Sequence, residues 1–141
     1  MTLPKVVREN RAKSVGGRRL LALASFLETK VPRKRFYFGR VVADDGHSRG
    51  CGSNGCAMGW APSVPMLRMA GLRRNTAGMP VFKDTDYYIS VATALFDISS
   101  EEAVFLFQPK EVGGVPGTLP TSATPKQVAA HIRDFVYYSG M

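Results

Sequence analysis

Residues that carry chemistry are scarce in this chain of 141 amino acids. It has two histidines, two cysteines and a single tryptophan. It also lacks a Walker-type phosphate loop, the glycine pattern of a dinucleotide-binding site, a cluster of carboxylates and an internal repeat. Most small enzymes carry more catalytic groups than this. The sequence therefore predicts no cofactor and favours a protein without enzymatic activity.

Long hydrophobic runs are missing as well. No apolar stretch approaches the roughly 18–20 residues that span a bilayer, and no apolar core of a signal peptide follows the N-terminal charges. Nothing in the sequence indicates an oxidising compartment. We therefore expect a cytoplasmic protein with reduced thiols and no transmembrane segment.

What is present suits a small globular domain. The content of 45% hydrophobic and 21% charged residues is that of a soluble protein, and the length is enough for one core. Residues 1–17 are basic, have weak apolar periodicity and end in two glycines. They predict a flexible N-terminal arm, and residues 18–141 predict a single globular domain.

Apolar periodicity predicts a mainly α fold, with α+β as the alternative. We expect about five helices around one core and at most a small two-stranded β element, near Phe36–Val42 and Val81–Phe82. The first helix should cover about residues 18–29. Later helices should cover about 64–70 and 85–96.

Capping boxes predict the starts of two more helices, at Ser99–Glu102 and at Thr124–Gln127. The helix from Ser99 and the one before it have the spacing of a DNA-binding helix-turn-helix. However, the second helix begins with two glutamates, which would repel phosphates where a recognition helix must attract them. We therefore expect a buried helical hairpin.

Both cysteines and the tryptophan lie in residues 49–61, which read R-G-C-G-S-N-G-C-A-M-G-W-A. The glycines allow a tight turn, and serine and asparagine are good N-cap residues, so a short helix over about 55–61 should follow. A tryptophan on that helix would anchor the core. We expect a structural centre made of Cys51, Gly52, Cys56, Gly59 and Trp60.

Four interpretations of the cysteines are open. The favoured one is that both are small buried hydrophobes. A disulfide between Cys51 and Cys56 is the second. In the third, Cys56 at a helix N-terminus is the nucleophile of a small hydrolase or transferase, with His131 as its base. In the fourth, His47, Cys51 and Cys56 hold a metal, although the C-x2-C pair of structural zinc is missing. His131 itself is expected to be partly buried and bonded to a carbonyl.

Two resemblances involve this stretch. The order C-G-S, then Cys56 and Trp60, is similar to the nucleophile segment C-G-S-C-W of papain-type cysteine peptidases, with two extra residues before Cys56 and three before Trp60. The motif C-G-x3-C-A-x-G-W-A, together with the block L-F-x-I-S-x-E-E-A-x-x-L-F, resembles a group of small uncharacterised proteins from bacteria and their phages. That second resemblance covers most of residues 18–137 and implies no activity.

Positive charge is concentrated in the first third of the chain. Residues 1–50 contain 12 of the 19 lysines and arginines but 4 of the 11 acids, whereas the remaining 91 residues contain seven of each. The net charge of +8 therefore belongs to residues 1–50. This asymmetry favours an acidic partner, which is a nucleic acid, an anionic protein surface or a membrane face.

Within that third, residues 33–40 read R-K-R-F-Y-F-G-R. Cations interleaved with aromatic rings are typical of platforms for single-stranded nucleic acid. The segment should be extended, and the favoured interpretation is that Phe36 and Phe38 point into the core while the cations lie on the surface.

The leading hypothesis is a non-enzymatic binding protein of phage or mobile-element type. Its basic first third would dock on nucleic acid or on a host protein that handles nucleic acid, acting in the second case as an inhibitor. The alternatives are the thiol enzyme and a structural subunit that oligomerises through aromatic residues. The residues expected to contact the partner are Arg18, Arg19, Arg33, Lys34, Arg35, Tyr37 and Arg40.

Overall fold

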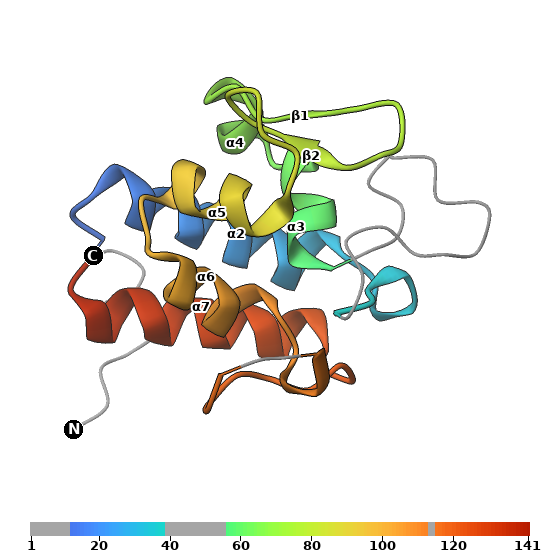
Figure 1. Cartoon of the computed structure of the whole chain (residues 1–141). Helices are drawn as coiled ribbons and strands as arrows, with labels where there is room; N and C mark the ends of the chain where they lie inside the picture. Colours follow the sequence, from blue (N-terminus) through green and yellow to red (C-terminus); the bar gives the residue numbers. More distant parts are fainter. Residues whose placement is uncertain (1–11, 39–55, 113–114) are drawn as a thin grey trace.

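The computed structural model describes residues 12–38, 56–112 and 115–141. Within these ranges the chain forms the helices α2 to α7, three 3-10 turns labelled η1 to η3, and one two-stranded antiparallel sheet (Figure 1). The predicted mainly α fold with a small β element is confirmed. None of the helices described is long and apolar enough to cross a membrane.

In chain order the elements are α2 (Val15–Lys30), η1 (Arg33–Arg35), α3 (Ala57–Trp60), η2 (Ala61–Ser63), α4 (Pro65–Met69), β1 (Arg73–Arg74), β2 (Pro80–Val81), α5 (Tyr88–Phe96), α6 (Ser100–Phe107), η3 (Lys110–Val112) and α7 (Pro125–Ser139).

Helix α2 begins three residues earlier than predicted. The side chain of Ser14 accepts a hydrogen bond from the amide of Gly17 at 2.9 Å, which caps the first turn at Val15. Gly16 and Gly17 are therefore buried in the helix instead of ending the predicted arm. The leucine stripe is as expected, because Leu20, Leu23 and Leu27 are fully buried.

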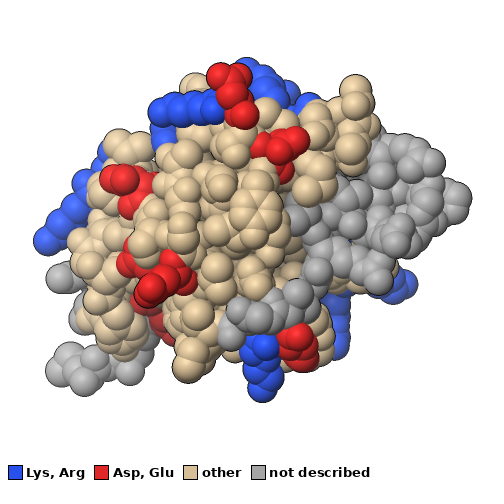
Figure 2. All heavy atoms as spheres, in the orientation of Figure 1, with Lys and Arg blue, Asp and Glu red and all other residues tan. Residues whose placement is uncertain are grey.

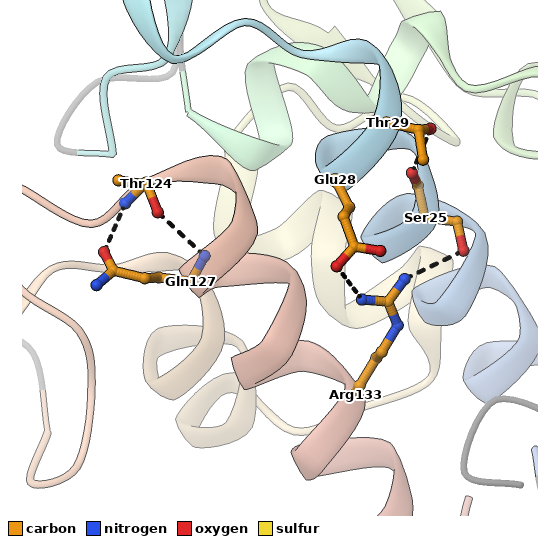
Figure 3. Close-up of polar contacts among 6 residues, drawn as sticks. All are labelled: Ser25, Glu28, Thr29, Thr124, Gln127 and Arg133. Atoms are coloured by element: carbon orange, nitrogen blue, oxygen red, sulfur yellow. Dashed lines mark hydrogen bonds and ion pairs between the residues drawn. The ribbon is translucent and has the colours of Figure 1, made fainter. Parts of the chain in front are cut away.

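Helix α7 runs antiparallel to α2 and makes the most extensive helix contact of the described chain. At one end, the amides of Lys13 and Ser14 donate to the carbonyl oxygen of Met141. Further along, Arg133 of α7 is 4% exposed and reaches across to α2, where its guanidinium donates to the Glu28 carboxylate at 3.1 Å (Figure 3). The same guanidinium donates to Ser25 Oγ at 3.4 Å. Because Arg133 is buried, a shift in register that separated it from Glu28 would leave its charge unpaired, so the pair favours the observed register of the two helices.

Helices α5 and α6 form the predicted helical hairpin, which packs on the core through its apolar residues and leaves its other side exposed. Asp97 ends α5 in the left-handed region, at φ 54°. The predicted capping box then opens α6, because Ser99 Oγ accepts from the Glu102 amide at 3.1 Å and the Glu102 carboxylate accepts from the Ser99 amide at 2.8 Å. Phe96 and Phe107 stack in the core with their ring centroids 5.8 Å apart.

The second predicted capping box also forms, at the start of α7. Thr124 Oγ1 accepts from the Gln127 amide at 3.2 Å, and the Gln127 side chain accepts from the Thr124 amide at 2.9 Å (Figure 3). Pro125 occupies the first helical position, where its missing N–H costs nothing.

The strand pairing differs from the prediction. Val81 and Pro80 pair with Arg73 and Arg74, and not with Phe36 or Phe38. The two strands form a short hairpin whose turn is stabilised by Asn75. Its Oδ1 atom accepts hydrogen bonds from the amides of Ala77 and Met79, at 2.9 and 3.0 Å. Closing this short loop costs less chain entropy than pairing with a segment some forty residues away. Residues 39–42 of the predicted strand lie outside the described residues.

The first turn of α2 lies directly against the end of α5, which makes Gly16 a test of the fold. A Cβ atom at Gly16 would lie 1.9 Å from the carbonyl oxygen of Phe96. Alanine normally stabilises a helix by about 1 kcal/mol relative to glycine. We expect Gly16→Ala instead to lower the free energy of unfolding by about 2 kcal/mol or more, because the backbone must shift.

Urea denaturation measures this change, with Gly17→Ala as the matched control. The nearest atom to a Cβ at Gly17 lies at 3.0 Å, so the loss there should be clearly smaller. A Gly16→Ala protein as stable as the parent would contradict the close approach of α2 and α5.

Candidate binding surface

Three of the predicted contact residues form one exposed turn, which we call the basic turn: Arg33, Lys34 and Arg35. The structure gives a 3-10 turn here where the sequence predicted an extended segment. The carbonyl of Pro32 accepts from the Arg35 amide at 3.0 Å, and the carbonyl of Arg33 accepts from the next amide at 3.3 Å. All three side chains are exposed. The turn therefore presents three positive charges on consecutive residues.

The aromatic residues after the basic turn attach it to the core. Phe36 and Phe38 are 7% and 1% exposed, and their rings stack with centroids 6.4 Å apart. Tyr37 between them is 43% exposed. This alternation confirms the core interpretation of the two phenylalanines. One ring, not three, is left beside the basic turn for contact with a partner.

Trp60 fixes the other side of the basic turn. Its indole Nε1–H donates to the carbonyl oxygen of Arg35 at 3.1 Å, while its ring packs near Phe26 of α2. A tryptophan that is 7% exposed thus bonds the main chain of an exposed arginine. Trp60 of the predicted structural centre therefore holds the main chain of the basic turn at Arg35.

The described members of the structural centre are all buried. Cys56 is 2% exposed and is the N-cap residue of α3, and its carbonyl oxygen accepts from the Trp60 amide at 3.0 Å. The carbonyl oxygen of Gly59 accepts from the Arg74 guanidinium at 3.2 Å. The favoured interpretation of Cys56 as a buried hydrophobe is confirmed. Cys51 and Gly52 lie outside the described residues.

The thiol-enzyme alternative fails at its nucleophile. Burial raises the pKa of the Cys56 thiol to about 11, an effect that outweighs the opposing hydrogen bonds from neighbouring amides. A catalytic cysteine needs an exposed thiol and a lowered pKa, and Cys56 has neither. The proposed base is engaged elsewhere, since His131 Nε2 lies 3.0 Å from the carbonyl oxygen of Phe105. That contact is the one expected of a structural histidine.

Most of the proposed metal site lies outside the described residues, so it stays a prediction. His47 and Cys51 lie outside the described residues, as does Arg40 among the predicted contact residues. In the part of the chain that the structure describes, no three His, Cys, Asp or Glu side chains come close enough to hold a metal ion. Cys56 is a free thiol, and the other half of the suggested disulfide lies among the residues not described.

A groove of about 380 Å³ lies next to the basic turn, between the end of α2 and the start of α7. Its floor is apolar, with Leu27, Val31 and Pro125 all buried. Arg33 stands on one rim and Lys126 on the other, and both side chains are exposed. The two cations come from segments more than ninety residues apart in the chain, so sequence patterns did not associate them.

Several other arginines stabilise the fold, which the sequence did not reveal. Arg19, one of the predicted contact residues, donates to the carbonyl of Leu95 at 2.9 Å at the end of α5. Arg73 donates to the Arg68 carbonyl at 2.6 Å, where α4 ends. Cations near helix C-termini interact favourably with the exposed carbonyl groups there. Arg18 remains exposed and donates to the main chain of Lys13 at 3.3 Å.

Charge is distributed unevenly along the described chain. The described residues 12–38 contain seven lysines and arginines and one acid, Glu28, whereas residues 84–108 contain five acids and no cation. Figure 2 shows the face over α5 and α6, where acids are scattered over uncharged surface and the lysines and arginines lie towards its edge. The basic and acidic segments therefore present an electrostatic polarity to a partner.

Comparison with known proteins adds no assignment. No protein-family model, no curated protein and no solved structure matches this chain.

The burial of Cys56 predicts an unreactive thiol. With a pKa of about 11, on the order of one thiol in a thousand is ionised at pH 8, and the sulfur is also inaccessible. Iodoacetamide followed by peptide mapping should leave Cys56 unmodified in the native protein and modify it in urea. Rapid native labelling would contradict the described burial.

The same shift predicts a stability change at high pH. Because the folded state holds the thiol proton more tightly than the unfolded state, stability is full below about pH 9 and falls as the pH rises towards 11. Cys56→Ala should remove this component of the pH dependence in urea denaturation.

The bond from Trp60 predicts a specific loosening of the basic turn. Trp60→Phe keeps an aromatic ring but removes the donor to Arg35, and we expect a loss of about 1 kcal/mol in the free energy of unfolding. Amide hydrogen exchange should accelerate at residues 33–36 and stay unchanged in α6. Equal acceleration in both places would contradict a local role.

Proposed function

We propose that this chain is a non-enzymatic binding protein whose basic first third docks on a polyanion. The polyanion is a nucleic acid or the acidic surface of a protein that handles nucleic acid. The observation that carries the proposal is the basic turn, which is exposed yet held to the core by Trp60 on one side and by Phe36 and Phe38 on the other.

Rigid attachment matters for affinity. Three cations on a flexible segment lose main-chain and side-chain conformational entropy when a partner orders them. Cations on a fixed turn lose only side-chain entropy. The basic turn also lies beside Lys126, across the groove between α2 and α7. A chain of negative charges can therefore meet cations on both rims of one concave surface.

The polarity of the surface supports a defined orientation. The acids of residues 84–108 repel a polyanion and the cations of residues 12–38 attract it. Attraction of this kind depends on salt, because binding releases the counterions condensed on the polyanion.

The test is fluorescence anisotropy with a labelled 16-nucleotide single strand, a 16-base-pair duplex and polyglutamate, each across a salt series. The variant carries Arg33→Gln, Lys34→Gln and Arg35→Gln. Its matched control carries Arg68→Gln, Lys83→Gln and Lys110→Gln, which remove the same charge from exposed positions elsewhere.

We expect the basic-turn variant to lose about tenfold or more in affinity at low salt, with the slope of log K against log salt reduced by about 2. The control should lose much less. Affinity that is independent of salt, or equal losses in both variants, would overturn the proposal. Binding to polyglutamate alone would assign the partner as an acidic protein surface.

A further inference from the structure

The opposite end of the α2–α7 pair carries a second concave surface with a cation and aromatic rings. A groove of about 320 Å³ is lined there by Lys13, Val136, Tyr137, Tyr138 and Gly140. Tyr138 is 73% exposed and lies edge-on to Tyr137, with ring centroids 4.8 Å apart. Arg18 is also exposed and donates to the main chain of Lys13. The leading hypothesis from sequence did not use the two tyrosines.

The two grooves lie at opposite ends of the contact between the two helices, and we call the strip of surface between them the α2–α7 seam. Tyr137 shares a face of α7 with Lys126, and Tyr138 lies about 100° further round the helix. On α2, Arg18, Ser25 and Glu28 are spaced by seven and three residues and therefore share a face. On α7, Lys126, Arg133 and Tyr137 are spaced by seven and four residues and share a face as well. Contacts from Arg133 to Ser25 and Glu28 show that these two faces meet (Figure 3).

Cations stand at both ends of the α2–α7 seam, and Asp134 of α7 lies one helical turn before Tyr138. Lys126 and Arg33 stand at one end, and Lys13 and Arg18 at the other. In the middle, the carboxylate of Glu28 is paired with the guanidinium of Arg133, so this acid adds little net repulsion. Helix α2 has 16 residues and is about 24 Å long, which sets the separation of the two ends.

We propose that the α2–α7 seam is a track for single-stranded nucleic acid, with a base stacked on Tyr138 at one end and phosphates held by the basic turn at the other. The inference rests on the proposed function and narrows its partner. An exposed ring beside cations is what sequence-tolerant binding of single strands requires, since the cations hold phosphates and the ring holds a base. A duplex offers its phosphates but keeps its bases stacked and inaccessible to Tyr138.

The length of the track makes a quantitative prediction. A stacked strand advances about 3.4 Å per nucleotide, so about seven nucleotides are needed to reach from one end of α2 to the other. Affinity should therefore rise steeply between strands of four and eight nucleotides and only slowly beyond twelve. We expect labelled oligothymidylates of 4, 8, 12 and 16 nucleotides to show this step in anisotropy titrations at fixed salt.

The chain offers a matched pair of variants for the same titrations. Lys13→Gln with Tyr138→Ala alters the seam, and Lys83→Gln with Tyr87→Ala alters another exposed lysine and another exposed tyrosine, which is 58% exposed next to Tyr88. The seam variant should bind the 12-nucleotide strand at least about fivefold more weakly and lose the step. The control should keep its affinity for the 12-nucleotide strand and should also keep the step between four and eight nucleotides. Thermal melting should show that both variants are folded.

The outcomes separate this inference from the proposed function. If the seam variant matches the control while the basic-turn variant still loses affinity, the track is wrong and the polyanion proposal stands. Tighter binding to a duplex of equal length than to the single strand would also overturn the track. If no strand or duplex binds at low salt, the track is overturned, and titration with polyglutamate then decides the polyanion proposal separately.

Discussion

The ion pair between Arg133 and Glu28 is the interaction on which the surface geometry depends. It joins α7 to α2 inside their contact, where one misplaced residue would leave a buried guanidinium without its carboxylate. With the register of the two helices fixed, the end of α2 lies against the start of α7, and the main chain before α2 bonds the carbonyl of Met141. The two grooves lie at the two ends of that alignment.

The way the chain uses its arginines explains why charge alone did not locate the surface. Arg19, Arg73, Arg74 and Arg133 each bond carbonyl, hydroxyl or carboxylate oxygens within the fold. The guanidinium suits this role because it keeps its charge and offers several donors in fixed directions. The basic turn differs from them because its side chains extend from the core while its main chain bonds to Trp60. The contrast separates cations that hold the fold from cations available to a partner.

Features encoded within a few residues were predictable from the sequence. The capping boxes at Ser99 and Thr124 form as expected, because both partners lie three residues apart. The buried Cys56 and the carbonyl contact of His131 also followed from residue type and apolar periodicity. The alternation of Phe36 and Phe38 was open between two interpretations, and burial decided it.

Features that depend on distant partners were not predictable. The capping of α5 by Arg19 joins residues 76 positions apart, and the pairing of Arg133 with Glu28 joins residues 105 apart. The start of α2 was misjudged because two glycines usually weaken a helix, whereas here Gly16 is needed for contact with Phe96. The second groove escaped notice because Lys13 and Tyr138 come from opposite ends of the chain.

We propose that the partner binds along the side formed by α2, the basic turn and α7, and avoids the acidic α5–α6 hairpin. Two-dimensional amide NMR of the full chain, titrated with a 12-nucleotide single strand, tests it most directly. We expect the largest shift changes at residues 13–18, 33–37, 124–126 and 137–138, with α5 and α6 nearly unchanged. The largest changes in α5 and α6, or changes spread evenly over the chain, would contradict it.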